Sequence, residues 1–181
     1  MGCANSSAVM GPSLNENPIC VTLLGLSGVG KTSLIEYVAG VYNPDDPPIH
    51  TNGIVLTDII IGQLKYRFYD VSGFPSHTSE WNKCIGDSDC VIYVVDPTGI
   101  DAGLAFTQDT INRTRDNVVS RKLPVYILLN KAPPETSLEN IYSVMEKYFY
   151  NVPHEFGRIH RLNNDVLKIF EWIQTQVQKK T

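Results

Sequence analysis

Features of a membrane-spanning, secreted or nucleic-acid-binding protein are missing from this sequence of 181 residues. No apolar stretch approaches the roughly 18 residues that a membrane-spanning helix needs, and the first residues lack the apolar core of a secretory signal. Lysine and arginine do not cluster and the net charge is −4, so no basic face is available to follow nucleic-acid phosphates. We therefore expect no nucleic-acid partner, secretory signal or membrane-spanning helix.

Metal-binding spacing is also absent from the cysteines and the histidines. The cysteines are Cys3, Cys20, Cys84 and Cys90. Two of them, Cys20 and Cys90, lie inside apolar runs, which is typical of buried thiols in a reducing compartment. The histidines are His50, His77, His154 and His160. None has an acidic or cysteine partner at catalytic or metal spacing, so we expect them to be surface or hydrogen-bonded residues.

The composition, 43% hydrophobic and 19% charged, is ordinary for one soluble domain with a substantial core. Residues 1–18 are rich in Asn, Ser, Gly and Pro, which predicts a flexible tail before a single domain over residues 19–181. The tail opens with Met1-Gly-Cys-Ala-Asn-Ser6, the pattern for N-myristoylation of Gly2, and Cys3 is a candidate palmitoylation site. A coincidental match is the alternative. One myristoyl chain binds membranes marginally, so stable anchoring requires Cys3.

Residues 25–32, Gly-Leu-Ser-Gly-Val-Gly-Lys-Thr, fit the phosphate-binding pattern G-x-x-x-x-G-K-[ST]. An apolar run over 19–24 precedes them and helical spacing over 33–39 follows. Backbone N–H groups of such a loop and of the helix start surround phosphate oxygens, while Lys31 reaches the β- and γ-phosphates and Thr32 ligates Mg²⁺. A glycine-rich turn between buried elements is the alternative. The candidate nucleotide-binding residues are Gly25, Ser27, Gly28, Val29, Gly30, Lys31, Thr32 and Ser33.

Alternating strand and helix patterns predict an α/β domain with a mostly parallel sheet of about six strands and helices on both faces. Residues 54–61 and 64–70, joined by Gly62-Gln63, predict an antiparallel edge hairpin. Continuous apolar runs predict buried parallel strands, periodic apolar spacing predicts helices, and Asn164 or Asp165 is a candidate cap. The later strands are expected at 90–95, 125–129 and 156–162, and the helices at 101–122, 137–150 and after 165.

The second hairpin strand ends in Asp70-Val-Ser-Gly73, a pattern that suits a nucleotide switch. The carboxylate of Asp70 would hold Mg²⁺ through water, and the Gly73 amide would bond the γ-phosphate. Because small P-loop kinases usually proceed through parallel units, the hairpin favours a switch over a small-molecule kinase by analogy of fold. The kinase stays as a third alternative.

Together these motifs resemble the Ras superfamily of small GTPases, and within it the Arf and Arf-like branch. The resemblance extends from Ile19 onward and rests on the myristoylation signal, the Gly-Leu form of the loop and Trp81, eleven residues after Asp70. It implies GTP and GDP with Mg²⁺ as ligands. Residues 51–54, Thr-Asn-Gly-Ile, resemble the first switch segment, which makes Thr51 a second protein ligand of Mg²⁺, beside Thr32.

The resemblance also implies how the protein works. It implies a monomer at the cytoplasmic face of a membrane, cytosolic when released, that recruits effectors in membrane trafficking. Effectors, exchange factors and GTPase-activating proteins would bind at Thr51 and at residues 70–81. The Asp70-Val-Ser-Gly73 form and Glu171-Trp-Ile-Gln174 are similar to ciliary Arf-like members.

Two positions depart from the family. Phe74 stands where the family has the glutamine that orients the attacking water, and a phenyl ring cannot hydrogen-bond water. We expect no catalytic side chain and, at most, slow hydrolysis on the order of 10⁻⁴ s⁻¹ or below. Alternatively, Phe74 packs in a mobile segment or contacts a partner, and both interpretations can hold together.

The base motif N-K-x-D reads Asn130-Lys-Ala-Pro133, so the carboxylate that accepts hydrogen bonds from guanine is missing. Asn130 and Lys131 stay candidate nucleotide contacts, although an ordinary polar loop is possible. Glu135 could approach the base, and the third base element, expected near residues 160–162, does not match. A second hypothesis is therefore a degenerate pseudo-GTPase that serves as an interaction module and binds nucleotide weakly or without base preference.

Overall fold

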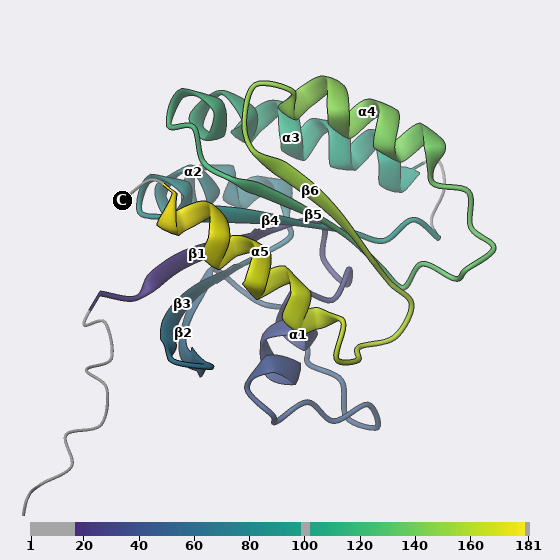
Figure 1. Cartoon of the computed structure of the whole chain (residues 1–181). Helices are drawn as coiled ribbons and strands as arrows, with labels where there is room; N and C mark the ends of the chain where they lie inside the picture. The colour runs from purple at the N-terminus through teal and green to yellow at the C-terminus, as the bar shows by residue number, and fades with distance from the viewer. Residues whose placement is uncertain (1–16, 99–101, 180–181) are drawn as a thin grey trace, which may run out of the picture.

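The computed structural model describes residues 17–98 and 102–179 and contains a six-stranded sheet in the order β2-β3-β1-β4-β5-β6 (Figure 1). Strands β2 and β3 pair antiparallel, and every other neighbouring pair is parallel. This confirms the mostly parallel sheet with an antiparallel edge hairpin. The strands are β1 (Ile19–Leu24), β2 (Ile54–Ile61), β3 (Leu64–Val71), β4 (Cys90–Val95), β5 (Val125–Asn130) and β6 (His154–Ile159).

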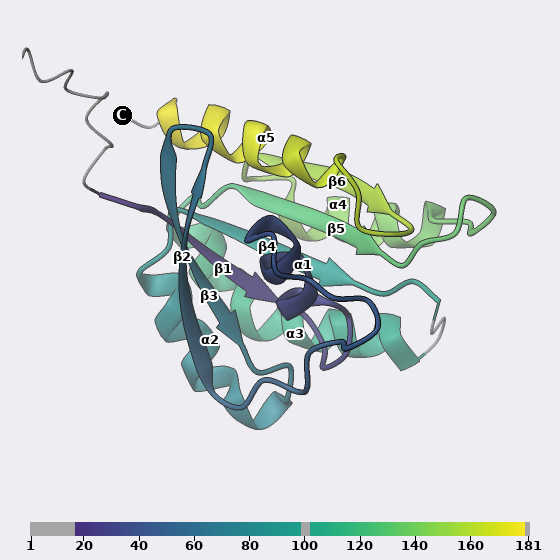
Figure 2. The same ribbon diagram turned by 90° about the horizontal axis from the view of Figure 1, so that it is seen from below.

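Helices cover both faces of the sheet. The helices α2, α3 and α4 pack on one face, while α1 and α5 lie on the other, as Figures 1 and 2 show. No helix among residues 17–98 and 102–179 is long and apolar enough to span a membrane. The helices are α1 (Lys31–Val38), α2 (Thr78–Gly86), α3 (Ala102–Ser120), α4 (Glu139–Phe149) and α5 (Val166–Gln178), and a 3₁₀ turn, Pro75–His77, precedes α2.

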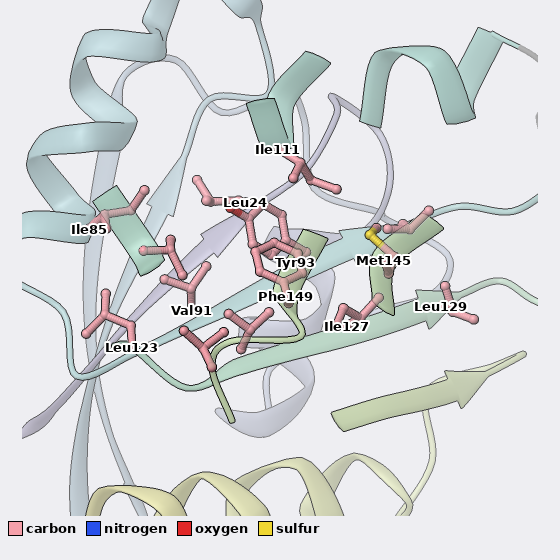
Figure 3. Packing of buried hydrophobic residues seen from close by; sticks show 14 of the residues in the cluster. Leu24, Ile85, Val91, Tyr93, Ile111, Leu123, Ile127, Leu129, Met145 and Phe149 are labelled. Atoms are coloured by element: carbon pink, nitrogen blue, oxygen red, sulfur yellow. The ribbon is translucent and has the colours of Figure 1, made fainter. Parts of the chain in front are cut away.

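The alternating side chains of the central strands build two cores. In β4, Val91 and Tyr93 face the α2–α4 layer, while Ile92 faces the α1–α5 layer. Figure 3 shows Tyr93 beside Phe149 in the first core. Both strands β4 and β5 are buried along their whole length, which explains their continuous apolar sequences.

Several predicted boundaries were wrong. The last strand begins at His154, not at 156, because its backbone pairs with β5 whatever its side chains are. The predictions also missed the helix α2, which follows the predicted Asp70–Gly73 turn. Asp165 precedes α5 but makes no side-chain cap hydrogen bond. Most of the predicted tail lies outside the described residues, and so do both of its lipidation sites, Gly2 and Cys3.

Candidate functional site

The loop between β1 and α1 brings the phosphate-binding motif to the carboxyl-terminal edge of the sheet (Figure 2). Its shape requires glycine where other backbone approaches closely. Gly30 has φ 99°, and a Cβ there would overlap the Asn130 side chain. Gly73, which follows β3, packs against the backbone of Leu26 and Ser27, and a Cβ there would overlap both. The loop is therefore in direct contact with the segments after β3 and β5.

Lys31 turns back over this loop. Its Nζ donates to the carbonyl oxygens of Gly25, at 2.9 Å, and Leu26, at 2.8 Å. The side chain is buried, and this burial lowers the pKa of Lys31 to about 8 although the nearby Asp70 carboxylate acts in the opposite direction. An ammonium group held in so little water interacts strongly with an anion. The group is well placed to bind phosphate oxygens.

Three predicted cation-site residues converge. Thr32 Oγ1 and Thr51 Oγ1 lie 3.0 Å apart and donate to Asp70 Oδ2 at 2.7 and 3.1 Å. The other oxygen, Asp70 Oδ1, is buried without a hydrogen-bond partner. Two hydroxyls and a carboxylate are the oxygen donors that Mg²⁺ accepts, in company with water and phosphate oxygens. Within the described residues no group of three or more His, Cys, Asp or Glu side chains could hold a metal.

A cavity of about 230 Å³ opens beside this cluster. The predicted residues that line it are Ser27, Gly28, Gly30, Lys31, Thr32, Ser33, Thr51, Gly73 and Lys131. The predicted residues Gly25, Val29, Asp70 and Asn130 are not part of its lining. Gly25 and Asp70 accept hydrogen bonds from the lining residues Lys31 and Thr32, and Asn130 donates to Val29. The prediction missed the lining residues Tyr42, Pro47, Pro48, Ile49 and His50. These lie in the connection between α1 and β2, which has no motif or periodicity to identify them.

A second cavity of about 670 Å³ shares Gly30, Ser33, Tyr42 and Lys131 with the first. Its remaining lining comes from Tyr37, Pro44, Asn130 and residues 160–162. The motif that should contact a base and the segment expected to hold the third base element therefore meet here. A triphosphate in the first cavity would place its nucleoside toward the second.

The first two residues of the base motif, Asn130 and Lys131, are hydrogen-bonded to the phosphate loop. Asn130 Nδ2 donates to Val29 O at 2.8 Å, and Lys131 Nζ donates to Gly28 O at 2.6 Å and lies 3.3 Å from Asp96. These bonds join the loop after β5 to the phosphate loop. Pro133 adds no side-chain acceptor.

Arg158 of β6 fixes the loop that carries Pro133. Its guanidinium donates to the carbonyl oxygens of Ala132, Pro133 and Thr136. Glu135, which was considered as a substitute acceptor, is exposed and does not line the second cavity. The described part of the chain therefore presents no carboxylate in the lining of that cavity.

In the segment after β3, the Phe74 side chain is 46% exposed. Trp81 is buried in the core and its Nε1 donates to Ser72 O at 2.8 Å. Trp81 therefore anchors the segment after β3, while Phe74 points outward near the first cavity.

Residues 7–151 match the model of the ADP-ribosylation factor family. The chain is 30% identical over 117 residues to ADP-ribosylation factor-like protein 13B of Chlamydomonas reinhardtii, which covers 64% of this chain and 21% of that protein. It is 27% identical over 129 residues to human ADP-ribosylation factor-related protein 1, with 68% and 64% covered. The chain thus spans less than two thirds of these relatives.

A solved structure has the same fold. The structure of the small GTPase Arl6 BBS3 from Trypanosoma brucei, with bound nucleotide analogue GppNp, has a TM-score of 0.76 and 18% identity. The match covers 91% of this chain and 100% of that chain. The six-stranded sheet with its five helices is therefore that of a small G domain.

Proposed function

Because the chain belongs to the ADP-ribosylation factor family, we propose that it is a nucleotide-binding molecular switch that binds GTP and GDP with Mg²⁺. The observation that carries this proposal is the convergence of Thr32, Thr51 and Asp70 from three separate segments. A chain without phosphate or metal chemistry has no physical need to bring these three side chains to one point.

In this proposal the triphosphate occupies the first cavity. The loop amides and Lys31 bind the β- and γ-phosphates, and the Gly73 amide bonds the γ-phosphate. Thr32, Thr51 and Asp70 are the residues that would hold Mg²⁺, Asp70 through water, and the bound cation would neutralise phosphate charge. Loss of the γ-phosphate would remove the group bound by the Gly73 amide and an oxygen ligand of the Mg²⁺ that Thr51 would hold, so residues 51–56 and 70–81 would be released.

The output of the switch is the recruitment of effectors at residues 51–56 and 70–81. Ile54, Val55 and Leu56 of the edge strand β2 are exposed and begin three residues after Thr51 in the chain. An exposed apolar strand edge next to a nucleotide-controlled segment is suited to binding a protein partner. Regulators that exchange or hydrolyse the nucleotide would approach the same segments.

We place this activity on the cytoplasmic face of a membrane, in membrane or ciliary trafficking, with a cytosolic pool and a monomeric chain. The support is the myristoylation pattern at Gly2 and the adjacent Cys3. Gly2→Ala should move the protein from the membrane to the soluble fraction, and Cys3→Ser should weaken its retention, because one acyl chain binds marginally. Unchanged fractionation of both variants would contradict the anchoring.

The absence of an acceptor at Pro133 favours a second candidate, a module that binds nucleotide weakly or without base preference and does not cycle. Guanine N1–H and N2–H₂ are donors, and a buried donor without a partner costs about 1–3 kcal/mol. The carboxylate-free lining of the second cavity leaves these donors to water or to backbone carbonyls.

Equilibrium binding of GTP, GDP and ATP in the presence of Mg²⁺ separates the candidates. The switch predicts GTP and GDP binding by the wild-type chain and its loss in Lys31→Ala, while Lys168→Ala, an exposed lysine of α5, serves as the matched control. Equal affinities for ATP and GTP would support the base-unselective module. If the chain binds none of the three nucleotides, the proposed switch is ruled out.

A further inference from the structure

Three segments meet at one corner of the first cavity. The Gly73 backbone packs against Leu26 and Ser27. Ser27 Oγ and His50 Nδ1 lie 2.7 Å apart and share a hydrogen bond. The His50 ring faces the Phe74 ring edge-on, with centroids 6.2 Å apart. The phosphate loop, the connection before β2 and the segment after β3 are thus joined through one imidazole.

In the proposed function this corner is where the γ-phosphate lies. The Gly73 amide and Thr51 both interact with that phosphate or its cation, and His50 directly precedes Thr51. His50 lines the same cavity as Lys31, Thr51 and Gly73. An imidazole at this place is therefore within the region from which water would attack the terminal phosphorus.

The neighbours of His50 suit it to bind that water. We propose that His50 orients the attacking water in this chain, in place of the glutamine that Phe74 replaces; this inference rests on the proposed function. When Nδ1–H donates to Ser27 Oγ, Nε2 carries the lone pair and accepts a hydrogen bond from water. A base whose orientation is fixed by a third group is the usual arrangement for activation of a nucleophile.

The Phe74 ring has a different part in this arrangement. It cannot bond the water, but its edge-on packing against His50, together with the Ser27 hydrogen bond, restricts the imidazole. The charged groups that line the same cavity are Lys31 and Lys131, and Asp70 lies behind Thr51.

In the hydrolytic step, the water oxygen forms a bond to the γ-phosphorus, and the bond from this phosphorus to the oxygen shared with the β-phosphate breaks. The electron pair of that bond stays on the β-phosphate oxygen. One proton of the water passes to an oxygen of the released phosphate or to solvent, while His50 Nε2 accepts a hydrogen bond from the other proton and so holds the water in place. The products are GDP and inorganic phosphate.

Two other histidines, His77 and His154, are hydrogen-bonded to carboxylates instead. His77 Nδ1 lies 2.9 Å from Glu80 Oε2, and His154 Nε2 lies 2.8 Å from Glu146 Oε2. His154 begins the parallel strand β6, at the amino-terminal end of the strands, whereas the phosphate loop follows the carboxyl-terminal end of β1. It is therefore a matched control: a second hydrogen-bonded imidazole that does not line the site.

The test is single-turnover hydrolysis of GTP loaded with Mg²⁺, measured by chromatography of GTP and GDP. We expect His50→Ala to lower the rate about tenfold or more, and His50→Gln to retain most of it because glutamine can also bond water. His154→Gln should hydrolyse at the wild-type rate. Added imidazole should restore hydrolysis in His50→Ala without accelerating the wild-type chain, a response that a merely structural role of His50 does not produce.

GTP affinity, measured separately with each variant, distinguishes the two proposals. If the wild-type chain binds no GTP, the proposed function fails and this inference fails with it. If GTP binds normally but is not hydrolysed, or if His50→Ala hydrolyses it as fast as wild type, only the role of His50 is overturned. The same holds if imidazole gives no rescue.

Discussion

Phe74 is placed where a glutamine would reach the γ-phosphate end of the cavity, directly after Gly73. The Phe74 ring is half exposed. Among the described residues, the one aromatic ring that it contacts is that of His50. A side chain with little burial contributes little to the core, so its replacement should alter chemistry more than folding.

We expect Phe74→Gln to raise single-turnover GTP hydrolysis about tenfold or more, because the amide can orient water that the phenyl ring cannot. Phe74→Leu is the matched control, since it keeps an apolar side chain and should leave the rate unchanged or lower. Chromatography of loaded nucleotide gives both rates. An equal rate in wild type and Phe74→Gln, or an equal gain with leucine, would contradict this assignment.

The sequence predicted some residues of the site and missed others. The glycines, Lys31 and Thr32 follow a motif because backbone sterics and phosphate chemistry permit few alternatives at those positions. Tyr42 and His50 are different. They lie in the connection between α1 and β2, whose path is set by tertiary contacts such as the bond from His50 to Ser27. No local pattern encodes such a contact.

Among the elements, β4 and β5 were predictable because burial on both faces demands continuous apolar sequence. The helix α2 was missed because its apolar residues, Trp81, Cys84 and Ile85, form only one short turn of periodic pattern. The start of β6 was misplaced because His154 and Glu155 are polar, yet their backbones pair with β5. Backbone pairing at a sheet edge places few demands on side chains.

Strand β6 also controls the loop that carries Pro133, through Arg158. We expect Arg158→Met to loosen residues 132–136 and to cost about 1 kcal/mol of stability, because Arg158 is exposed and a typical hydrogen bond contributes about that much net. Amide hydrogen exchange in this loop should accelerate, and GTP and ATP affinities should fall by a similar factor because the loop offers no base-specific carboxylate.

Arg113→Met is the matched control for this variant. Arg113 forms an exposed i,i+4 pair with Asp109 on α3, and such pairs contribute about 0.3–0.5 kcal/mol. Urea unfolding should therefore separate the two arginines clearly. If Arg158→Met is as stable as Arg113→Met and its loop exchanges at the wild-type rate, then Arg158 does not hold the loop in solution.

For the whole molecule, the site joins three segments that lie far apart in the chain. Asp70 belongs to β3, Thr32 to α1 and Thr51 to the connection before β2. A ligand bound by all three stabilises the native state alone, because the unfolded chain cannot bring them together. At a concentration 100 times its dissociation constant, such a ligand adds about 2.7 kcal/mol.

We therefore expect GTP with Mg²⁺ to raise the thermal midpoint by about 5–11 °C, since 1 kcal/mol shifts a domain of this size by about 2–4 °C. Chelation of Mg²⁺ with EDTA should remove most of the increase. Asp70→Asn should abolish the part that depends on Mg²⁺, because the amide loses the charge beside the two threonine hydroxyls. Asp58→Asn is the control: Asp58 is paired with Lys65 and Arg67 on the exposed hairpin, so its Mg²⁺-dependent increase should match wild type. Equal increases with and without Mg²⁺ in the wild-type chain would show that these hydroxyls and Asp70 hold no cation.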